Sequence, residues 1–408
     1  MRDVKYLLIG GGLAAIRGAQ QIRTLDPDGS LLIVCDEPMA PYDRPPLSKK
    51  YLAGQTQAAD LLLEPPEKLA AQKIECVLGD AVTALDAAGK IATLSSGEQI
   101  KFEKAMIATG GRATTLDIAG ADLGGIYYLR TAADADALRA EAQPGRKAVI
   151  IGGGFIGLET AATLNALGVD VTIIEALPRA LARLGNAELS DYVAHYCAAR
   201  GVKFMFDALV SGFRGEGRVN GVTTSLGDTL DCDFVCIGVG LRPNVELAVA
   251  AGLDVDDGVV VNEQMRTSHP DIYAAGDVIN YFDPLAGRRQ RAEHWGHAEH
   301  SGQIAGRAMA GGAETYDHLP YVWSDIFDLH IEFAGDAHEH DAQVRRGAPE
   351  SGAFLLVYLK EGVVRAFFSV NFPAREYAMV RRMIQKKTNV GGREAQLADM
   401  NVALRSLL

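Results

Sequence analysis

Short apolar runs alternate with helical patterns along much of the chain, and one order of elements occurs twice. In each occurrence, an apolar run typical of a buried strand precedes a helical stretch, and a second apolar run follows it. The first occurrence comprises residues 3–9, a helix to about residue 25 and residues 31–35, and the second comprises residues 148–151, 158–167 and 171–174. The repeated strand–helix–strand order predicts two α/β units with parallel sheets.

The pattern differs in two other regions. Between residues 61 and 104, short runs such as 91–94 and 99–102 alternate with turns, which predicts a small β insertion before a further strand over 104–108. From residue 321 onward, runs at 329–333, 353–359 and 363–370 predict antiparallel strands, and a helix is expected over about 374–386. Thr131 is the expected N-cap of a helix over about 132–140.

The turn after the first strand of each α/β unit is rich in glycine. Glycines allow a tight turn, the approach of a pyrophosphate and close helix packing, while the helix N-terminus presents N–H groups and a positive dipole to phosphate. The first turn contains Gly10, Gly12 and Ala15, in GxGxxA spacing, and the second contains Gly152, Gly154 and Gly157, in GxGxxG spacing. The sequence therefore predicts a dinucleotide on each unit.

An acidic residue follows the second strand of each unit, where a ribose 2′-OH is expected. In the first unit, Asp36 and Glu37 both follow the strand, and Asp36 is favoured because it comes first. In the second unit, Glu175 would accept hydrogen bonds from the ribose and repel a 2′-phosphate. This acid predicts NADH in preference to NADPH.

Two further strands deliver candidate ligand residues. Gly238 lies near the end of the run 234–239, which we interpret as a crossing point between the domains and a candidate cofactor contact. Asp277 follows the run PDIYAAGD, where it could accept a hydrogen bond from a sugar or ribitol hydroxyl or could cap a helix. The fold class is therefore α/β, with two Rossmann-like dinucleotide-binding domains and a C-terminal α+β domain. The expected domains are 1–112 with 241–318, 113–240, and 319–408.

Composition narrows the classes of function. The net charge of −12 disfavours nucleic acid or an anionic membrane as the main partner, and no apolar run is long enough to span a membrane. Five scattered cysteines without a CxxC pair indicate a reduced, cytoplasmic protein. The histidines at 294, 297 and 300 lack the spacing of a metal site, so we expect solvated helix positions and no metal.

Seven short motifs together resemble one family. They are GGGLAA, PYDRPPLSK, ATGG, GGGFIGLE, YAAGD, EHW and YVWSD. They look like the FAD- and NADH-dependent ferredoxin reductases of bacterial oxygenase systems, the putidaredoxin reductase type, to which rubredoxin reductases and apoptosis-inducing factor are similar. The resemblance extends from about residue 4 to residue 359.

The resemblance implies a role for each motif residue. FAD would occupy the first glycine motif and NADH the second, with Arg44, Arg130 and Asp277 on the phosphates or ribitol of FAD. Lys49 would lie by flavin N5 and pair with Glu159, Glu293 would reach the nicotinamide carboxamide, and Trp323 would pack near both rings. The helix after Trp295 would direct its N-terminus at the flavin pyrimidine edge, and His294 would either contact a ring or simply begin the helix.

The implied activity is electron transfer from NADH through FAD to a small acidic [2Fe–2S] ferredoxin. Residues 45–49 contain no cysteine, which disfavours a thiol relay. The basic pairs 381–382 and 386–387 are either a solvated face or a docking site for an acidic partner. Oxygen, a quinone or rubredoxin as acceptor, and an NADH-sensing role like that of apoptosis-inducing factor, remain alternatives. The sequence leaves monomer and homodimer open.

Overall fold

The computed structural model describes residues 1–338 and 340–408. Contacts divide the chain into two compact units, which are treated separately below. Unit 1 comprises Met1–Asp43, Ala59–Arg112 and Leu241–Pro320, and unit 2 comprises Arg44–Ala58, Ala113–Gly240 and Tyr321–Leu408. Two of the five passages between the units lie in β7 (Gly111–Ala113) and just before β16 (Leu241–Pro243), and these two strands pair with each other.

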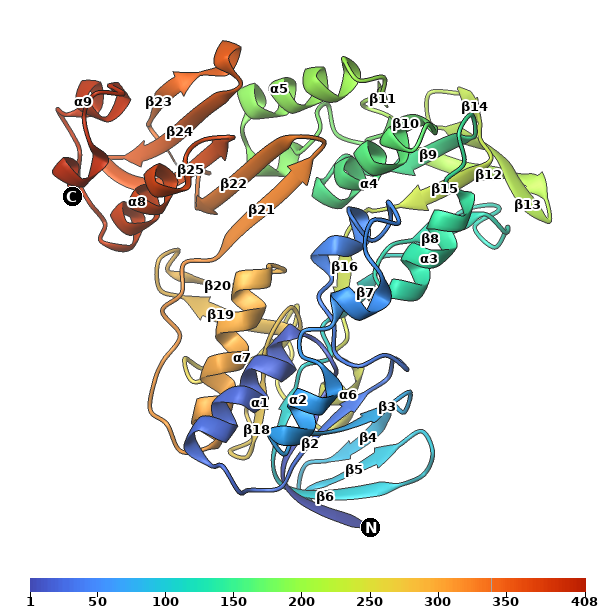
Figure 1. The fold of residues 1–408 in the computed structure, drawn as a ribbon, viewed down its shortest axis with the longest axis vertical. Helices are drawn as coiled ribbons and strands as arrows, with labels where there is room; N and C mark the ends of the chain where they lie inside the picture. Colours follow the sequence, from blue (N-terminus) through green and yellow to red (C-terminus); the bar gives the residue numbers. More distant parts are fainter. Residues whose placement is uncertain (339) are drawn as a thin grey trace. The chain divides into compact units, whose positions relative to one another are not determined.

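Unit 1 is built on a parallel sheet in the order β3-β2-β1-β6, with β18 on the far side of β6 (Figure 1). The strands are β1 (Arg2–Ile9), β2 (Leu31–Cys35), β3 (Glu75–Leu78), β6 (Gln99–Ile107) and β18 (Ile272–Ala274). The prediction of separate runs at 99–102 and 104–108 is wrong, because β6 is one strand. One edge of β6 pairs first with antiparallel β5 (Ile91–Leu94) of the β4 (Val82–Asp86)–β5 insertion and then with β18.

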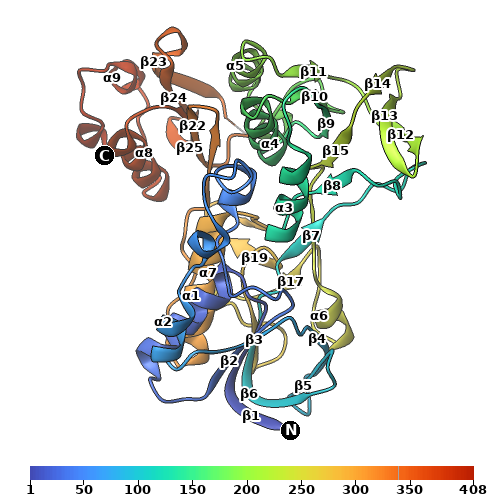
Figure 2. The same ribbon diagram turned by 45° about the vertical axis from the view of Figure 1, so that its right-hand side comes forward.

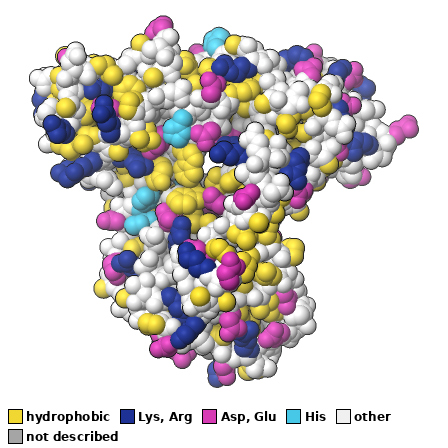
Figure 3. Space-filling view, in the orientation of Figure 1, with side chains coloured by type: hydrophobic (Ala, Val, Ile, Leu, Met, Phe, Trp, Pro, Cys, Tyr) yellow, Lys and Arg dark blue, Asp and Glu magenta, His cyan; other side chains and the backbone are white. Residues whose placement is uncertain are grey.

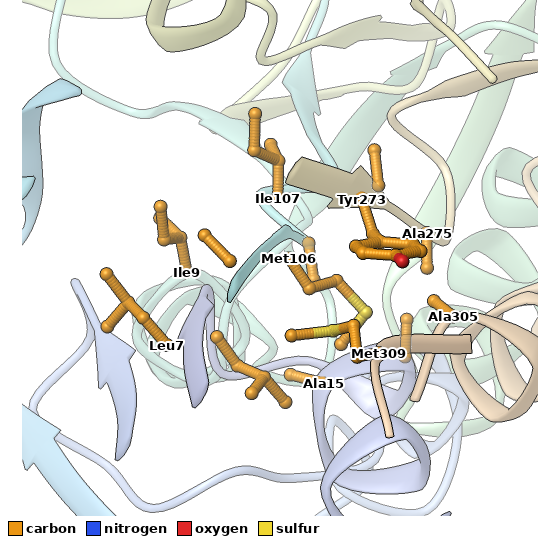
Figure 4. Packing of buried hydrophobic residues seen from close by; sticks show 14 of the residues in the cluster. Leu7, Ile9, Ala15, Met106, Ile107, Tyr273, Ala275, Ala305 and Met309 are labelled. Carbon is orange, nitrogen blue, oxygen red and sulfur yellow. The ribbon is translucent and has the colours of Figure 1, made fainter. Parts of the chain in front are cut away.

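Helices α1 (Leu13–Leu25) and α7 (Trp295–Met309) lie side by side in unit 1 (Figures 1 and 2). Their backbones approach so closely that a Cβ atom on Gly302 would lie 2.3 Å from the Ala14 carbonyl oxygen, and one on Gly306 would lie 2.2 Å from that of Gly18. Met106 of β6 and Met309 at the end of α7 lie in the hydrophobic core of the unit (Figure 4). Smaller elements complete the unit: α2 (Pro66–Ala71), α6 (Glu246–Ala250), β17 (Val259–Val260), β19 (Ile279–Asp283) and β20 (Arg288–Gln290).

Unit 2 contains a second parallel sheet, in the order β11-β10-β9-β15-β8. Its strands are β8 (Ile126–Tyr128), β9 (Lys147–Ile151), β10 (Asp170–Ile174), β11 (Lys203–Met205) and β15 (Phe234–Ile237), with helices α3 (Ala132–Glu141), α4 (Phe155–Ala166) and α5 (Ala187–Ala198). Thr131 caps α3 with a capping box, as predicted. Helix α4 begins three residues before the expected Leu158, because the glycine turn ends at the N-cap Gly154. An antiparallel sheet, β12 (Val210–Glu216), β13 (Arg218–Thr224) and β14 (Thr229–Asp231), was not predicted.

The C-terminal part of unit 2 is an antiparallel sheet in the order β21-β22-β25-β24-β23. Its elements are β21 (Tyr321–Ile326), β22 (Leu329–Gly335), β23 (Ala342–Ala348), β24 (Ala353–Lys360), β25 (Val363–Val370), α8 (Ala374–Gln385) and α9 (Glu394–Ala398). Ile150 and Ile173 of the parallel sheet share one hydrophobic core with Phe354 and Phe368 of this sheet. The segment with the 3₁₀ turn η1 (Pro45–Ser48) belongs to the same unit. The three-domain boundaries stay a prediction.

Candidate dinucleotide and redox sites

The first glycine turn of unit 1 has the shape of a phosphate cradle. Gly10 has φ +114°, and a Cβ atom there would lie 2.3 Å from the carbonyl oxygen of Ala108, so only glycine fits. A Cβ atom on Gly12, the N-cap of α1, would meet nothing within 4 Å among the described residues. Ala15 is fully buried one turn into the helix. The turn therefore leaves open space at a helix N-terminus, which fits the pyrophosphate of FAD.

The second turn repeats this geometry in unit 2. Gly152 has φ +107°, and its Cβ atom would lie 2.4 Å from the carbonyl oxygen of Gly238, at the end of β15. Gly154 caps α4 and faces space that the described residues leave open within 4 Å. A Cβ atom on Gly157 would lie 2.0 Å from the Gly152 carbonyl oxygen. This turn therefore fits a second pyrophosphate, and it packs more tightly than the first.

The acids at the strand ends differ in how they are held. Asp36 is exposed directly after β2, whereas the neighbouring Glu37 accepts a hydrogen bond from the Tyr42 hydroxyl at 2.6 Å. In unit 2, Glu175 accepts from the Gly153 N–H at 2.6 Å and from the Leu177 N–H at 2.9 Å. The Glu175 carboxylate is thus fixed beside the glycine turn, where it adds negative charge.

Asp277 and the start of α7 lie at the carboxyl end of β18 in unit 1. Gly276 turns the chain with φ +81° and donates its N–H to the Ser301 hydroxyl at 3.0 Å. Trp295 opens α7 and donates from Nε1 to Asp43 at 2.8 Å. This bond ties the N-terminus of α7 to the residue that precedes Arg44.

The neighbours of Trp295 have charged partners. Glu293 accepts from Arg291 at 2.6 Å. Burial lowers the pKa of His294, and the Asp277 carboxylate offsets part of that effect. His294 is therefore a neutral ring at neutral pH, able to donate from one nitrogen and accept at the other.

The prediction of solvated histidines is wrong for His297. This side chain is fully buried in the first turn of α7, where its Nδ1 lies 2.6 Å from the Tyr316 hydroxyl and its ring stacks on Tyr281 at 4.7 Å. Burial lowers its pKa to about 3. The spacing of the histidines does not say which face of α7 is buried, because that depends on what the helix packs against. In the structure, His297 lies on the buried face.

The expected pair of Lys49 and Glu159 is present in unit 2. Lys49 Nζ lies 2.8 Å from Glu159 Oε1, and the side chains are 18% and 4% exposed. Glu159 also accepts hydrogen bonds from the hydroxyls of Ser48 and, at 2.7 Å, Ser324. Three donors from η1, the residue after it and β21 therefore compensate a carboxylate buried on α4.

The segment that carries Lys49 is bonded to α4 and to the residues that precede α3. Thr163 of α4 donates to the Ser48 carbonyl at 2.8 Å, and Arg44 donates to the Arg130 carbonyl at 2.6 Å. Arg44 and Arg130, two candidate FAD contacts, are thus joined by a hydrogen bond from the Arg44 side chain to the Arg130 backbone.

Trp323 lies on β21, one residue before Ser324. It is partly buried and inclined against Tyr321, with ring centroids 5.9 Å apart. The sequence predicted no role for Ser48, Ser324 or Asp325. All three residues lie within the motifs PYDRPPLSK and YVWSD, so these motifs could have marked them as candidate site residues.

Three further features bear on metals, thiols and membranes. Among residues 1–338 and 340–408, no group of three His, Cys, Asp or Glu side chains is arranged to hold a metal ion. The five cysteines are free thiols, and burial raises the pKa of Cys35 to about 12. No helix in the described part of the chain combines the length and apolarity needed to cross a bilayer.

Two glycine cradles on separate parallel sheets, each with an acid at the next strand end, define a two-dinucleotide oxidoreductase. Family models for the pyridine nucleotide-disulphide oxidoreductases and for the reductase C-terminal domain match residues 4–302 and 321–408. The probable ferredoxin reductase CtmF of Castellaniella defragrans is 38% identical over 405 residues, 99% of this chain and 98% of the relative. The anthranilate 1,2-dioxygenase system ferredoxin–NAD(+) reductase component of Burkholderia cepacia is 36% identical, with 99% of both chains covered.

Solved structures agree. The ferredoxin reductase for the CYP199A2 system of Rhodopseudomonas palustris matches with a TM-score of 0.94 at 33% identity, covering 98% of this chain and 99% of the other. The covalent putidaredoxin reductase–putidaredoxin complex matches with a TM-score of 0.94 at 32% identity, covering 100% and 98%. The chain belongs to the ferredoxin reductases of the pyridine nucleotide-disulphide oxidoreductase family. The predicted fold class and family are confirmed.

Proposed function

We propose that this protein takes a hydride from NADH onto FAD and passes single electrons to a small iron–sulfur ferredoxin that feeds an oxygenase. The observation that carries the proposal is the pair of glycine cradles with matching geometry, Gly10 and Gly12 in unit 1 and Gly152 and Gly154 in unit 2. Bound FAD would supply the link between a two-electron transfer from NADH and single-electron transfers to the acceptor, a chemistry that the protein's side chains do not supply.

The residues divide between the two cofactors. FAD is assigned to Gly10, Gly12, Ala15, Asp36, Arg44, Arg130, Asp277 and Trp295, and NADH to Gly152, Gly154, Gly157, Glu175, Gly238 and Glu293. His294 is assigned to one of the two rings, the flavin or the nicotinamide. In this assignment the N-terminus of α7 offers a positive dipole to the pyrimidine edge of the flavin. Glu159 holds Lys49 in an ion pair at the position assigned to flavin N5, and Trp323 packs against the rings.

An acidic ferredoxin fits the surface of α8. Arg375, Arg382, Lys386 and Lys387 are exposed on or next to this helix, in a chain whose net charge is −12. Figure 3 shows Lys and Arg side chains on the surface in this part of the molecule. Charge of opposite sign on the two partners speeds their encounter. We assign a [2Fe–2S] protein to this face and place the enzyme in the reducing cytoplasm, consistent with its free thiols.

Anaerobic stopped-flow mixing tests the function. NADH is expected to bleach the flavin absorbance faster than NADPH does, and an acidic [2Fe–2S] ferredoxin is expected to restore it faster than rubredoxin, a quinone or oxygen. A preparation that binds no flavin refutes the proposal, and faster reoxidation by another acceptor assigns the activity to that acceptor.

The docking face has its own test. Lys386→Gln with Lys387→Gln should slow reoxidation by the ferredoxin and reduce its salt dependence, while the exposed Lys101→Gln control in unit 1 should not. Size-exclusion chromatography with and without NADH distinguishes monomer from homodimer.

A further inference from the structure

Lys49 has a second acidic neighbour, which leads to the surface. Asp325 Oδ2 lies 3.8 Å from Lys49 Nζ, and Asp325 Oδ1 lies 2.7 Å from His330 Nδ1. Asp325 and His330 are direct cross-strand partners in the antiparallel pair β21–β22. The register of this hairpin therefore holds the imidazole against the carboxylate.

The Asp325–His330 pair is exposed enough to exchange protons with water. The two side chains are 43% and 42% exposed, whereas Glu159 is 4% exposed. The hydrogen bond to Asp325 raises the pKa of His330, and the same bond lowers the pKa of Asp325. His330 is thus the group of this cluster that changes charge nearest to neutral pH.

Other charged groups act on the pair. Lys49 and Lys50 lower the pKa of Asp325, Lys49 also lowers the pKa of His330, and Glu332 raises the pKa of His330 from the same strand. From α8, Arg381 pairs with Glu332 at 3.0 Å, and Tyr377 also hydrogen-bonds Glu332. The Glu332 carboxylate is therefore already engaged by side chains of α8.

We propose that His330 is a positioning residue that sets the charge facing Lys49, by holding Asp325 when protonated and releasing it to Lys49 when neutral. The inference rests on the proposed function, in which Lys49 acts on flavin N5. Four groups contribute charge here: Lys49, Glu159, Asp325 and His330. Their charges sum to zero when His330 is protonated and to −1 when it is neutral. A hydride brings negative charge to the flavin, so the protonated form favours reduction.

Two substitutions fix the two states. His330→Gln keeps a polar side chain but no charge, and His330→Lys keeps a permanent positive charge at this half-exposed position. His195→Gln is the matched control, because His195 is exposed on α5 in the same unit and bonds a backbone carbonyl. The measurements are the stopped-flow rate of flavin reduction by NADH and the flavin midpoint potential from a dye-linked titration, each across pH values on both sides of neutrality.

The parent and the control should show a fall of about threefold to tenfold in the reduction rate as pH rises through the His330 pKa, the effect of one partly screened charge. His330→Gln should remain at the slow limit and His330→Lys at the fast limit, without this step. The midpoint potentials should follow the same order. Unchanged thermal unfolding midpoints will show that the variants are folded.

Each contrary result has one meaning. If both variants retain the step, or if both shift the rate and potential in the same direction, the inference is wrong while the proposed function stands. If the parent binds flavin that NADH does not reduce, the proposed function fails, and the potentials alone decide the inference. A protein without bound flavin overturns both.

Discussion

Replacement of Glu175 by glutamine tests the cofactor preference most directly. In the structure the carboxylate accepts from the Gly153 N–H at 2.6 Å and the Leu177 N–H at 2.9 Å. A glutamine keeps one carbonyl acceptor for the Gly153 N–H and removes the charge. The substitution therefore separates the charge of Glu175 from its support of the glycine turn.

The magnitude follows from two effects. A unit charge about 5 Å from the carboxylate at an effective dielectric constant of about 20 is repelled by about 3 kcal/mol, and solvent at this half-buried position reduces this to about 1.5–2 kcal/mol. Hydrogen bonds from the NADH ribose to a charged acceptor contribute about 1.5 kcal/mol, which a neutral amide partly loses. Together they predict a change of about 3 kcal/mol, or about a hundredfold, in selectivity.

The assay compares kcat/KM for NADH and NADPH, with ferricyanide as a one-electron acceptor. Most of the gain for NADPH should be a lower KM, because the lost repulsion acts in the ground state and the transition state alike. Glu216→Gln is the control, since Glu216 is an exposed acid on β12 of the same unit. A selectivity ratio that changes no more in Glu175→Gln than in the control would falsify the assignment.

Three further substitutions have expected outcomes. Lys49→Met should slow flavin reduction by NADH while the absorbance spectrum still shows bound FAD. The free energy of unfolding, measured in urea, should fall by about 3 kcal/mol in this variant, because Glu159 loses its buried cation. Gly157→Ala should raise the KM for NADH without flavin loss, since its Cβ atom would lie 2.0 Å from a carbonyl oxygen. Arg346→Met should expose the C-terminal tail to limited proteolysis, because Arg346 donates to the carbonyls of Leu397 and Val402 at 3.2 and 2.8 Å; undiminished protection would contradict this role.

Local structure was predictable where the signal is local. The strand 31–35, the run 363–370 and the capping residue Thr131 are all as the sequence predicted. The edge strand β23 was missed because its sequence, AQVRRGA, has adjacent arginines and no strong alternation. Arg346 in this strand is only 2% exposed, since the tail carbonyls that it binds come from more than 50 residues away.

Less of the candidate site than of the fold was predictable, because some of its residues are far apart in the sequence. Glycine spacing alone predicts both cradles, because the turn and its phosphate geometry are encoded in adjacent residues. The partners of Glu159 are not adjacent: Lys49 and Ser324 lie 110 and 165 residues away in the chain. Nothing in the local pattern at any of the three positions specifies the other two. Only the resemblance to known reductases linked Lys49 to Glu159, and it left Ser324 unassigned.

Helix α4 contributes both to the second glycine cradle and to the Lys49–Glu159 pair. Its N-terminus forms the second cradle at Gly154, and Glu159, just over one turn further on, compensates Lys49. Thr163, one turn later still, donates to the Ser48 carbonyl, so the segment with Lys49 is fixed to α4 at two points. A displacement of α4 at its cradle would therefore carry Lys49 with it. We therefore expect substitutions at the glycine turn to alter both NADH affinity and the environment of Lys49, because the cradle and the partners of Lys49 and Ser48 lie on one helix.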